Sequence, residues 1–262
     1  MTDAWTSGTG YESYVGRWSR SVAGEFLRWL AVPPGSAWLD FGCGTGALAH
    51  TILAAESPRL VIGCDRSADY VAFARQQVTD GRATFVVAEL PDLPLLPGGF
   101  DAVVGGLVLN FLPTPAEGVA AMRERARPGG TVAAYVWDYA DGMQLMRAFW
   151  DAAVQLAPAA RELDEAVRFP LCDPDALRAV FHDAGVRDVV VEPIVVPTVF
   201  RDFDDYWTPF LSGQGPAPGY AMGLSPERRA RLRDLIRQGL PASADGSIAL
   251  SARAWAVRGI AA

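Results

Sequence analysis

Three glycines at alternate positions follow an apolar run near the start of the chain. The stretch reads "AWLDFGCGTGALAHTIL" over residues 37–53, and it places Gly42, Gly44 and Gly46 between a strand-like and a helix-like pattern. Glycine lets the backbone turn tightly out of a strand and lets a ligand approach the main chain beside the next helix. The spacing is G-x-G-x-G, and it also fits the looser G-x-G-x-x-G/A dinucleotide pattern because Ala47 occupies the last small position. We therefore predict a cofactor-binding loop, which serves either a methyltransferase or a nicotinamide enzyme.

Two acidic residues follow the next two strand-like runs. Asp65 ends "RLVIGCD", about 20 residues after the loop, where a carboxylate can accept hydrogen bonds from both hydroxyls of a ribose. Both rival cofactors share that feature. Glu89 follows the third run, in "VVAELPDLP", and with the backbone N–H of Leu90 it can bind an adenine amino group and ring nitrogen. Dehydrogenases rarely need this second acid.

The elements that position these residues alternate along the first part of the chain. Short, strongly apolar strands that alternate with helices indicate a parallel sheet buried on both faces and joined by right-handed crossovers. The predicted elements are strand 37–41, helix 47–55, strand 59–65, helix 67–78, strand 83–89, strand 100–106, helix 115–126 and strand 129–137.

The alternation loosens after residue 137. Two more strands complete a mostly parallel, seven-stranded, doubly wound Rossmann-like α/β sheet with helices on both faces and inserts after strands five and six. The predicted segments are helix 143–157, helix 174–184, strand 186–196, the aromatic segment 203–210, a Gly/Pro loop over 212–219, helix 225–238 and strand 247–259.

Length and charge limit the domain count and the partners. The chain has 262 residues, which suits a single domain made of an N-terminal helical segment (1–34), a cofactor-binding core (35–137) and the remaining sheet with its inserts (138–262). A net charge of −7 disfavours nucleic acid, so a small molecule is the expected partner. The absence of lysine excludes Walker loops, Schiff-base enzymes and dehydrogenases with a Tyr-x-x-x-Lys pair.

The three cysteines, Cys43, Cys64 and Cys172, are widely spaced and form no C-x-x-C pair. This pattern argues against a disulfide framework and against a zinc site, so no metal is expected. No cationic leader and no run of about 18 apolar residues is evident. We expect a cytoplasmic protein without a membrane span, and the sequence leaves its oligomeric state open.

Five stretches, taken together, point to one family. They are "WLDFGCGTGALA", "GCDRS", "AELPDLPLLPGGFDAVV", "LNFLP" and "ARPGGTVAAYVW". Their order and spacing resemble class I S-adenosylmethionine-dependent methyltransferases, most closely the methyltransferase-domain proteins similar to the ubiquinone/menaquinone C-methyltransferases. The resemblance covers about residues 11–137, and its motifs are specific only in combination.

The resemblance implies one set of residues around the methionine part of S-adenosylmethionine. Gly42, Gly44 and Gly46 would lie against it, and Asp40 would support the glycine loop. Leu107, after the fourth strand, would offer main-chain contacts near the amino group of the cofactor.

A second set would surround the nucleoside. Asp65 would bind the ribose diol and Arg66 would lie beside the adenine. Glu89 would contact the adenine amino group, with the backbone of Leu90 beside it. This sequence departs from the family's usual pattern by having Glu89 in place of aspartate and Ala88 in place of glycine, and the longer side chain puts that contact in question.

The N-terminal segment "YESYVGRWSR" has two interpretations. Tyr14, Arg17 and Trp18 would either fold over the cofactor as a lid, with the arginine paired to its carboxylate, or belong to an amphipathic helix that only packs.

Substrate contacts are sought where open α/β sheets bind ligands, at the carboxyl ends of the strands. Trp137, Asp138 and Tyr139 follow the fifth strand and are the substrate-side candidates, while the catalytic residues are unknown. Other candidates have a simpler structural explanation, as core aromatics, surface histidines or a solvated arginine face: Tyr206, Trp207, Phe210, His50, His182, Arg228, Arg229, Arg231, Arg233 and Arg237.

The sequence thus predicts transfer of a methyl group from S-adenosylmethionine to a small, partly apolar molecule, with S-adenosylhomocysteine as the product. The acceptor would lie between the N-terminal helix and the inserts. An NAD(P)-dependent oxidoreductase and a non-catalytic cofactor-binding protein of the same fold remain alternatives.

Overall fold

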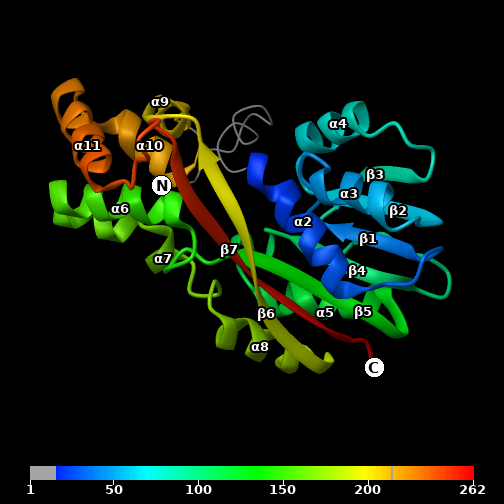
Figure 1. The fold of residues 1–262 in the computed structure, drawn as a ribbon. Coiled ribbons are helices and arrows are strands. Elements are labelled where there is room, and N and C mark those ends of the chain that lie inside the picture. The colour runs from blue at the N-terminus through cyan, green and yellow to red at the C-terminus, as the bar shows by residue number, and fades with distance from the viewer. Residues whose placement is uncertain (1–15, 214) are drawn as a thin grey trace. The chain divides into compact units, whose positions relative to one another are not determined.

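The computed structural model describes residues 16–213 and 215–262. Its strands form one seven-stranded sheet in the order β3-β2-β1-β4-β5-β7-β6 (Figure 1). The strands are β1 (Ala37–Phe41), β2 (Leu60–Asp65), β3 (Ala83–Val87), β4 (Phe100–Gly106), β5 (Ala126–Trp137), β6 (Arg187–Phe200) and β7 (Ile248–Ile260). The predicted doubly wound fold is confirmed.

Strand direction follows from the pairing. The first five strands pair in parallel, with Leu39 opposite Ile62 of β2 and Val103 of β4. β7 runs antiparallel to β5, since the Gly129 N–H donates to Ala261 O at one end and the Asp138 N–H donates to Arg253 O at the other. The sheet is therefore mixed. The predicted cofactor-binding residues that lie in strands, Asp40 and Asp65, belong to its parallel part.

The helices surround these strands. Figure 1 shows α2, α3 and α4 on one side of the parallel strands, and α5 and α8 on the other. Their bounds are α2 (Arg17–Leu30), α3 (Ala47–Ala55), α4 (Ala68–Gln77), α5 (Pro115–Arg125), α6 (Gln144–Leu156), α7 (Glu165–Arg168), α8 (Pro174–Asp183), α9 (Phe203–Trp207), α10 (Pro216–Gly223) and α11 (Pro226–Gly239), with short 3₁₀ turns η2 (Leu109–Phe111), η3 (Pro158–Leu163) and η4 (Thr208–Leu211). No described helix combines the length and apolar character that crossing a membrane requires.

The chain divides into two compact units. We call residues 19–136, 171–194 and 255–262 the core unit, and the described residues 16–18, 137–170 and 195–254 the insert unit. In the core unit every residue of β1 is buried, as expected for a strand with neighbours on both sides and helices on both faces.

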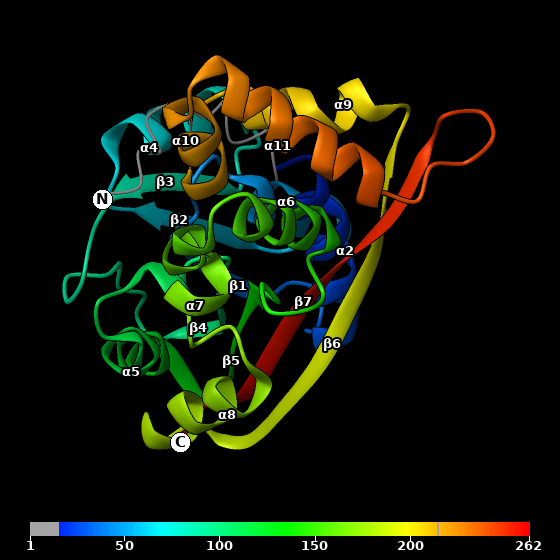
Figure 2. The same cartoon turned by 90° about the vertical axis from the view of Figure 1, so that its left-hand side faces the viewer.

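Helices α6, α10 and α11 of the insert unit pack together (Figure 2), and aromatic side chains form the core of this unit. Phe149 of α6 stacks on Phe210 at a centroid distance of 4.5 Å, and the Tyr206 hydroxyl donates to the Leu145 carbonyl at 2.8 Å. Tyr206, Trp207 and Phe210 are all buried. These rings therefore build the interior of the unit.

One predicted loop is wrong. Residues 212–219 were expected to be irregular, but Pro216 begins helix α10 and Gly215, with φ of 89°, precedes it. Proline suits the first helical position because its missing N–H has no partner there.

The arginine face of α11 is more engaged than a solvated surface would be. Arg229 donates to the carbonyls of Ala221, Met222 and Leu224, which end or follow α10. Arg237 lies over the Phe203 ring at 4.3 Å.

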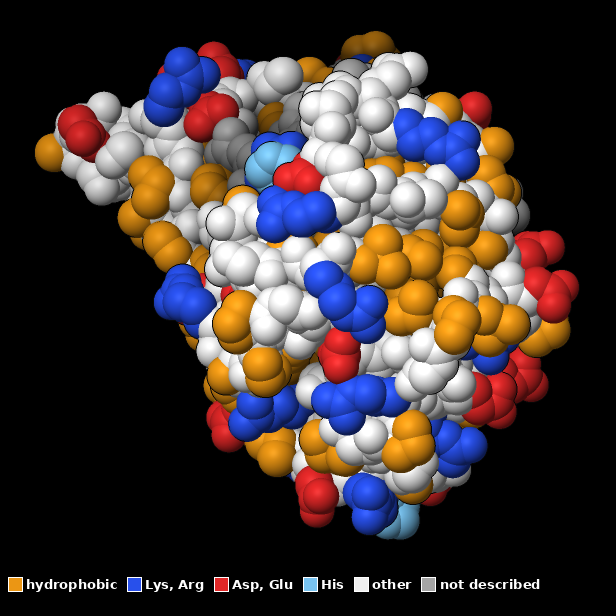
Figure 3. All heavy atoms as spheres, turned by 90° about the vertical axis from the view of Figure 1, so that its right-hand side faces the viewer, with side chains coloured by type: hydrophobic (Ala, Val, Ile, Leu, Met, Phe, Trp, Pro, Cys, Tyr) orange, Lys and Arg blue, Asp and Glu red, His pale blue; other side chains and the backbone are white. Residues whose placement is uncertain are grey.

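Figure 3 shows the surface on the side where Figure 1 places α4 and β3. Arginines on this face are interleaved with acidic and apolar side chains and do not gather into one basic surface.

Candidate cofactor site

The glycine loop leaves β1 and enters α3 with three left-handed residues. The φ angles of Gly42, Gly44 and Gly46 are 68°, 51° and 88°, a region that other residues adopt at a cost. A Cβ on Gly42 would lie 2.2 Å from Val108 Cγ2, whereas a Cβ on Gly44 would meet no atom of the described residues within 4 Å. Gly42 is thus required by packing, while the described part of the chain leaves space beside Gly44.

Asp65, the last residue of β2, holds this loop in place. Its Oδ2 accepts from the Gly44 N–H at 3.0 Å and its Oδ1 from the Ser67 N–H at 2.8 Å. Each carboxylate oxygen has about two acceptor positions, so each keeps one for a further donor. The side chain is half-buried, so these positions can meet a ligand. Two adjacent hydroxyls are a matching pair of donors.

Asp40 is a fully buried carboxyl beside the same loop. Its Oδ2 accepts from the Ala49 N–H at 3.0 Å in the first turn of α3. Its Oδ1 is buried without a hydrogen-bond partner among the described residues. Burial raises the pKa of Asp40 to about 7, and the nearby Asp65 carboxylate adds to the rise. Such an orphaned oxygen calls for a proton, a water molecule or a ligand donor.

The loop after β3 carries the predicted adenine contacts. Glu89 is exposed and Leu90 is half-buried. Arg125 of α5 reaches this loop, with Nε donating to Leu93 O at 3.2 Å and Nη2 to Pro91 O at 3.0 Å. Arg125 was missed in the sequence, because nothing in its local pattern shows which loop a helix end will meet.

The end of β4 contains a strained residue. Leu107 has φ of 58°, which costs energy for a residue with a branched side chain. Its N–H donates to Tyr135 O at 2.8 Å. Val108 then packs on the glycine loop through Gly42. The strained residue therefore lies one position before the contact with the glycine loop.

The remaining predicted cofactor residues are less informative. Arg66 is exposed. Tyr14 and the side chain of Arg17 lie outside the described residues. The Trp18 ring packs edge-on against Phe200 at 5.7 Å. The lid stays a prediction.

The substrate-side candidates are buried in the insert unit. Trp137, Asp138 and Tyr139 are 2%, 2% and 9% exposed. The Asp138 carboxylate pairs with Arg253 and also accepts from the Asp141 N–H. The pair between Asp138 and Arg253 thus links the end of β5 to β7. A role in substrate binding stays a prediction for Trp137, Asp138 and Tyr139.

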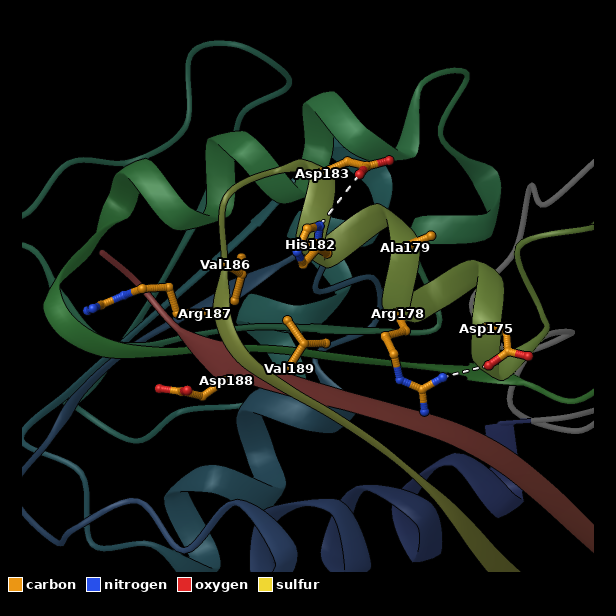
Figure 4. A pocket seen from close by; sticks show the side chains of 9 residues that line it. All are labelled: Asp175, Arg178, Ala179, His182, Asp183, Val186, Arg187, Asp188 and Val189. Atoms are coloured by element: carbon orange, nitrogen blue, oxygen red, sulfur yellow. Dashed lines mark hydrogen bonds and ion pairs between the residues drawn. The ribbon is translucent and has the colours of Figure 1, made fainter.

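A surface hollow between α8 and the start of β6 offers no comparable site. Figure 4 shows Arg178 paired with Asp175 and His182 beside Asp183, while Arg187 points away. In the sheet order β6 is an edge strand, with β4, β5 and β7 between it and β1. His182 is exposed, and so is the other histidine, His50, as the sequence predicts.

Comparison with known proteins decides the question that the glycine spacing leaves open. Residues 39–130 match the family model described as a methyltransferase domain. The glycine loop, Asp65, Glu89 and Leu107 all lie within this stretch. The chain therefore carries a class I, S-adenosylmethionine-dependent methyltransferase domain. The nicotinamide alternative loses its support, while the narrower similarity to quinone C-methyltransferases stays a prediction.

Two curated relatives match different lengths of the chain. An uncharacterized 37.1 kDa protein of transposon Tn4556 from Streptomyces fradiae is 33% identical over 186 residues, which are 70% of this chain and 52% of that protein. A probable tRNA methyltransferase 9B from Bos taurus is 35% identical over 107 residues, or 40% of this chain and 22% of that protein. The chain thus spans about half of the first relative and about a fifth of the second.

Solved structures share the fold. Phosphoethanolamine N-methyltransferase 2 from Haemonchus contortus, in complex with S-adenosyl-L-methionine, superposes with a TM-score of 0.60 at 16% identity. The match covers 98% of this chain and 58% of that one. At this identity the likeness establishes the architecture.

The described residues fit this cofactor on their own chemistry. Gly44 leaves room beside the backbone, and the Asp65 carboxylate is oriented with spare acceptor positions. Gly44 and Asp65 together provide a surface for an amino acid joined to a ribose. Asp40 is fully buried and supports the loop from behind by accepting from the Ala49 N–H.

Proposed function

We propose that the chain transfers a methyl group from S-adenosylmethionine to a small, partly apolar molecule and releases S-adenosylhomocysteine. One observation carries the proposal: the Asp65 carboxylate is held by Gly44 N–H and Ser67 N–H with an acceptor position left on each oxygen. The bound cofactor would supply an activated methyl on a sulfonium.

Different residues of the core unit would bind different parts of the cofactor. Asp65 would accept from the ribose hydroxyls, and Glu89 with the Leu90 N–H would bind the adenine edge. Gly44 would lie against the methionine part, while Asp40 would hold the start of α3 behind it. Leu107 would present its main chain near the amino group.

The catalytic demand on side chains is small. As the methyl moves to its acceptor, the positive charge of the donor disperses, so strong acid–base groups are not required. Alignment of the reacting atoms can contribute on the order of 7 to 11 kcal/mol. The two exposed histidines, His50 and His182, are accordingly given no role.

The choice of a small acceptor rests on charge. The net charge of −7 opposes a polyanionic substrate, since nucleic-acid binding depends on clustered basic residues. The tRNA-methyltransferase relative aligns with only 107 residues of this chain, at 35% identity and over 22% of its own length, so its substrate is not carried over to this chain. A cytoplasmic location is part of the proposal and is supported by the three cysteines, which are buried and form no disulfide among the described residues.

Methyl transfer is tested by measuring S-adenosylhomocysteine release with a panel of acceptors. The panel contains phenols, amines and enolisable carbon acids as small molecules, with bulk tRNA and ribosomal protein as the macromolecular alternatives. We expect turnover with a member of the first group alone. Turnover on tRNA or protein alone would overturn the proposed substrate class, and binding of the cofactor without any turnover would favour the non-catalytic alternative.

A further inference from the structure

We propose that Arg125 is a positioning residue that fixes the adenine-binding loop and thereby sets both cofactor affinity and selectivity for adenine. The inference rests on the proposed function, because it assigns a purpose to a contact within the same site. It concerns the segment 88–96, which follows β3 and which we call the adenine loop.

The contact is well defined. Arg125 sits at the end of α5, and its side chain is only 15% exposed. Its guanidinium spans two carbonyls of the adenine loop, Leu93 O through Nε and Pro91 O through Nη2. A planar guanidinium with fixed donors restrains both the distance and the orientation of the two carbonyls. Leu93 itself is 3% exposed, so the loop is anchored at this point.

The contact with Arg125 lies next to Glu89 and Leu90, the predicted adenine contacts. Pro91 directly follows Leu90 and lies two positions after Glu89, whose side chain is exposed. On the other side of them, the Ala88 N–H donates to Asp65 O at 3.0 Å. Glu89 and Leu90 thus lie between two fixed points of the backbone, one at Asp65 and one at Arg125.

This arrangement gives Arg125 a role beyond stability. Glu89 is exposed, and an exposed, flexible carboxylate distinguishes an amino group from a carbonyl poorly unless its backbone is held in place. The amino group of adenine donates to a carboxylate, whereas the carbonyl oxygen of hypoxanthine would face that carboxylate acceptor to acceptor. Holding the loop in place therefore lets the Glu89 carboxylate favour adenine over hypoxanthine.

Arg123 provides a matched control on the same helix. It donates from Nη1 to the Ala184 carbonyl at 2.8 Å, where α8 ends. Its loss removes an arginine–carbonyl bond from α5 without touching the adenine loop. Any general effect of weakening α5 appears in both variants.

The experiment compares the wild type with Arg125→Ala, Arg125→Lys and Arg123→Ala, well below the melting temperature of each. Calorimetric titration gives the affinities for S-adenosylhomocysteine and for its deaminated analogue, S-inosylhomocysteine. We expect Arg125→Ala to lose at least tenfold affinity for the adenine ligand and most of the preference for adenine over hypoxanthine. Arg125→Lys, with one donor group in place of the fork, should be intermediate, and Arg123→Ala should stay within twofold of the wild type.

The outcomes separate the inference from the function on which it rests. A wild type that binds neither ligand contradicts the proposed function. A wild type that binds and discriminates, with Arg125→Ala unchanged or with Arg123→Ala equally impaired, overturns the role of Arg125. If Arg125→Ala does not fold, Arg125→Lys decides, and unchanged selectivity in that variant counts against the proposal.

Discussion

Replacement of Asp65 by alanine should uncouple the ribose from the site while leaving the fold largely in place. In the free protein the variant loses two backbone contacts, those to Gly44 N–H and Ser67 N–H. Because the side chain is half-buried, water can replace part of these two hydrogen bonds. We therefore expect a loss of about 1 to 2 kcal/mol in the free energy of unfolding.

The loss in ligand binding should be larger. Two ribose hydroxyls donating to a charged acceptor contribute about 1.5 to 3 kcal/mol each, and tenfold in affinity corresponds to about 1.4 kcal/mol. Asp65→Ala should therefore weaken S-adenosylhomocysteine binding by roughly 10² to 10⁴-fold. Asp65→Asn keeps one acceptor and adds donors that face the Gly44 or Ser67 N–H, so an intermediate loss is expected.

Isothermal titration calorimetry measures these affinities, and urea denaturation measures the stability. Asp69→Ala is the control, because Asp69 lies four residues further along, in the first turn of α4, and is exposed. An Asp65→Ala variant that binds S-adenosylhomocysteine within twofold of the wild type would refute the assignment of this carboxylate to the ribose.

Three further predictions concern the glycines and the buried carboxyls. Gly42→Ala should destabilise strongly because its Cβ would overlap Val108, whereas Gly44→Ala should cost about 1 to 2 kcal/mol of backbone strain and sharply reduce S-adenosylhomocysteine affinity; equal melting temperatures for the two variants would contradict this. Asp40 is protonated below about pH 7 when folded but ionises near pH 4 when unfolded, so stability should fall as pH rises from about 4 to 7 and then level off. In the wild type this loss of unfolding free energy amounts to on the order of 4 kcal/mol at most, and Asp40→Asn should abolish it. Urea denaturation of both proteins at pH 5 and pH 8 measures the difference. Burial likewise raises the pKa of Glu165 to about 8, so Glu165→Gln should stabilise the protein at pH 9 more than at pH 6; the opposite trend in melting temperature would contradict the burial argument.

Much of the fold was readable from local pattern. Every strand of the parallel part was predicted, because buried strands are short apolar runs and their turns carry glycine, proline or acid at fixed positions. The loop expected at 212–219 was wrong because its glycines and prolines were interpreted as loop residues, although proline also initiates helices. Local pattern alone does not distinguish the two.

The site was predictable where one residue's chemistry is enough. Gly44 and Asp65 were named from spacing, and the structure brings them into hydrogen-bonding contact across 21 residues. Contacts between distant side chains were not visible in the sequence. The Asp138 carboxylate pairs with Arg253, 115 residues away, and Arg125 meets the adenine loop over 32 residues.

The most direct test of the account is a thermal shift of the purified chain with S-adenosylmethionine, S-adenosylhomocysteine, NAD and NADP measured side by side. A ligand present at about 100 times its dissociation constant adds roughly 2.7 kcal/mol of stability, which is readily measured as a rise in melting temperature. We expect stabilisation by S-adenosylmethionine and S-adenosylhomocysteine and none by NAD or NADP. Stabilisation by NAD or NADP alone would contradict it.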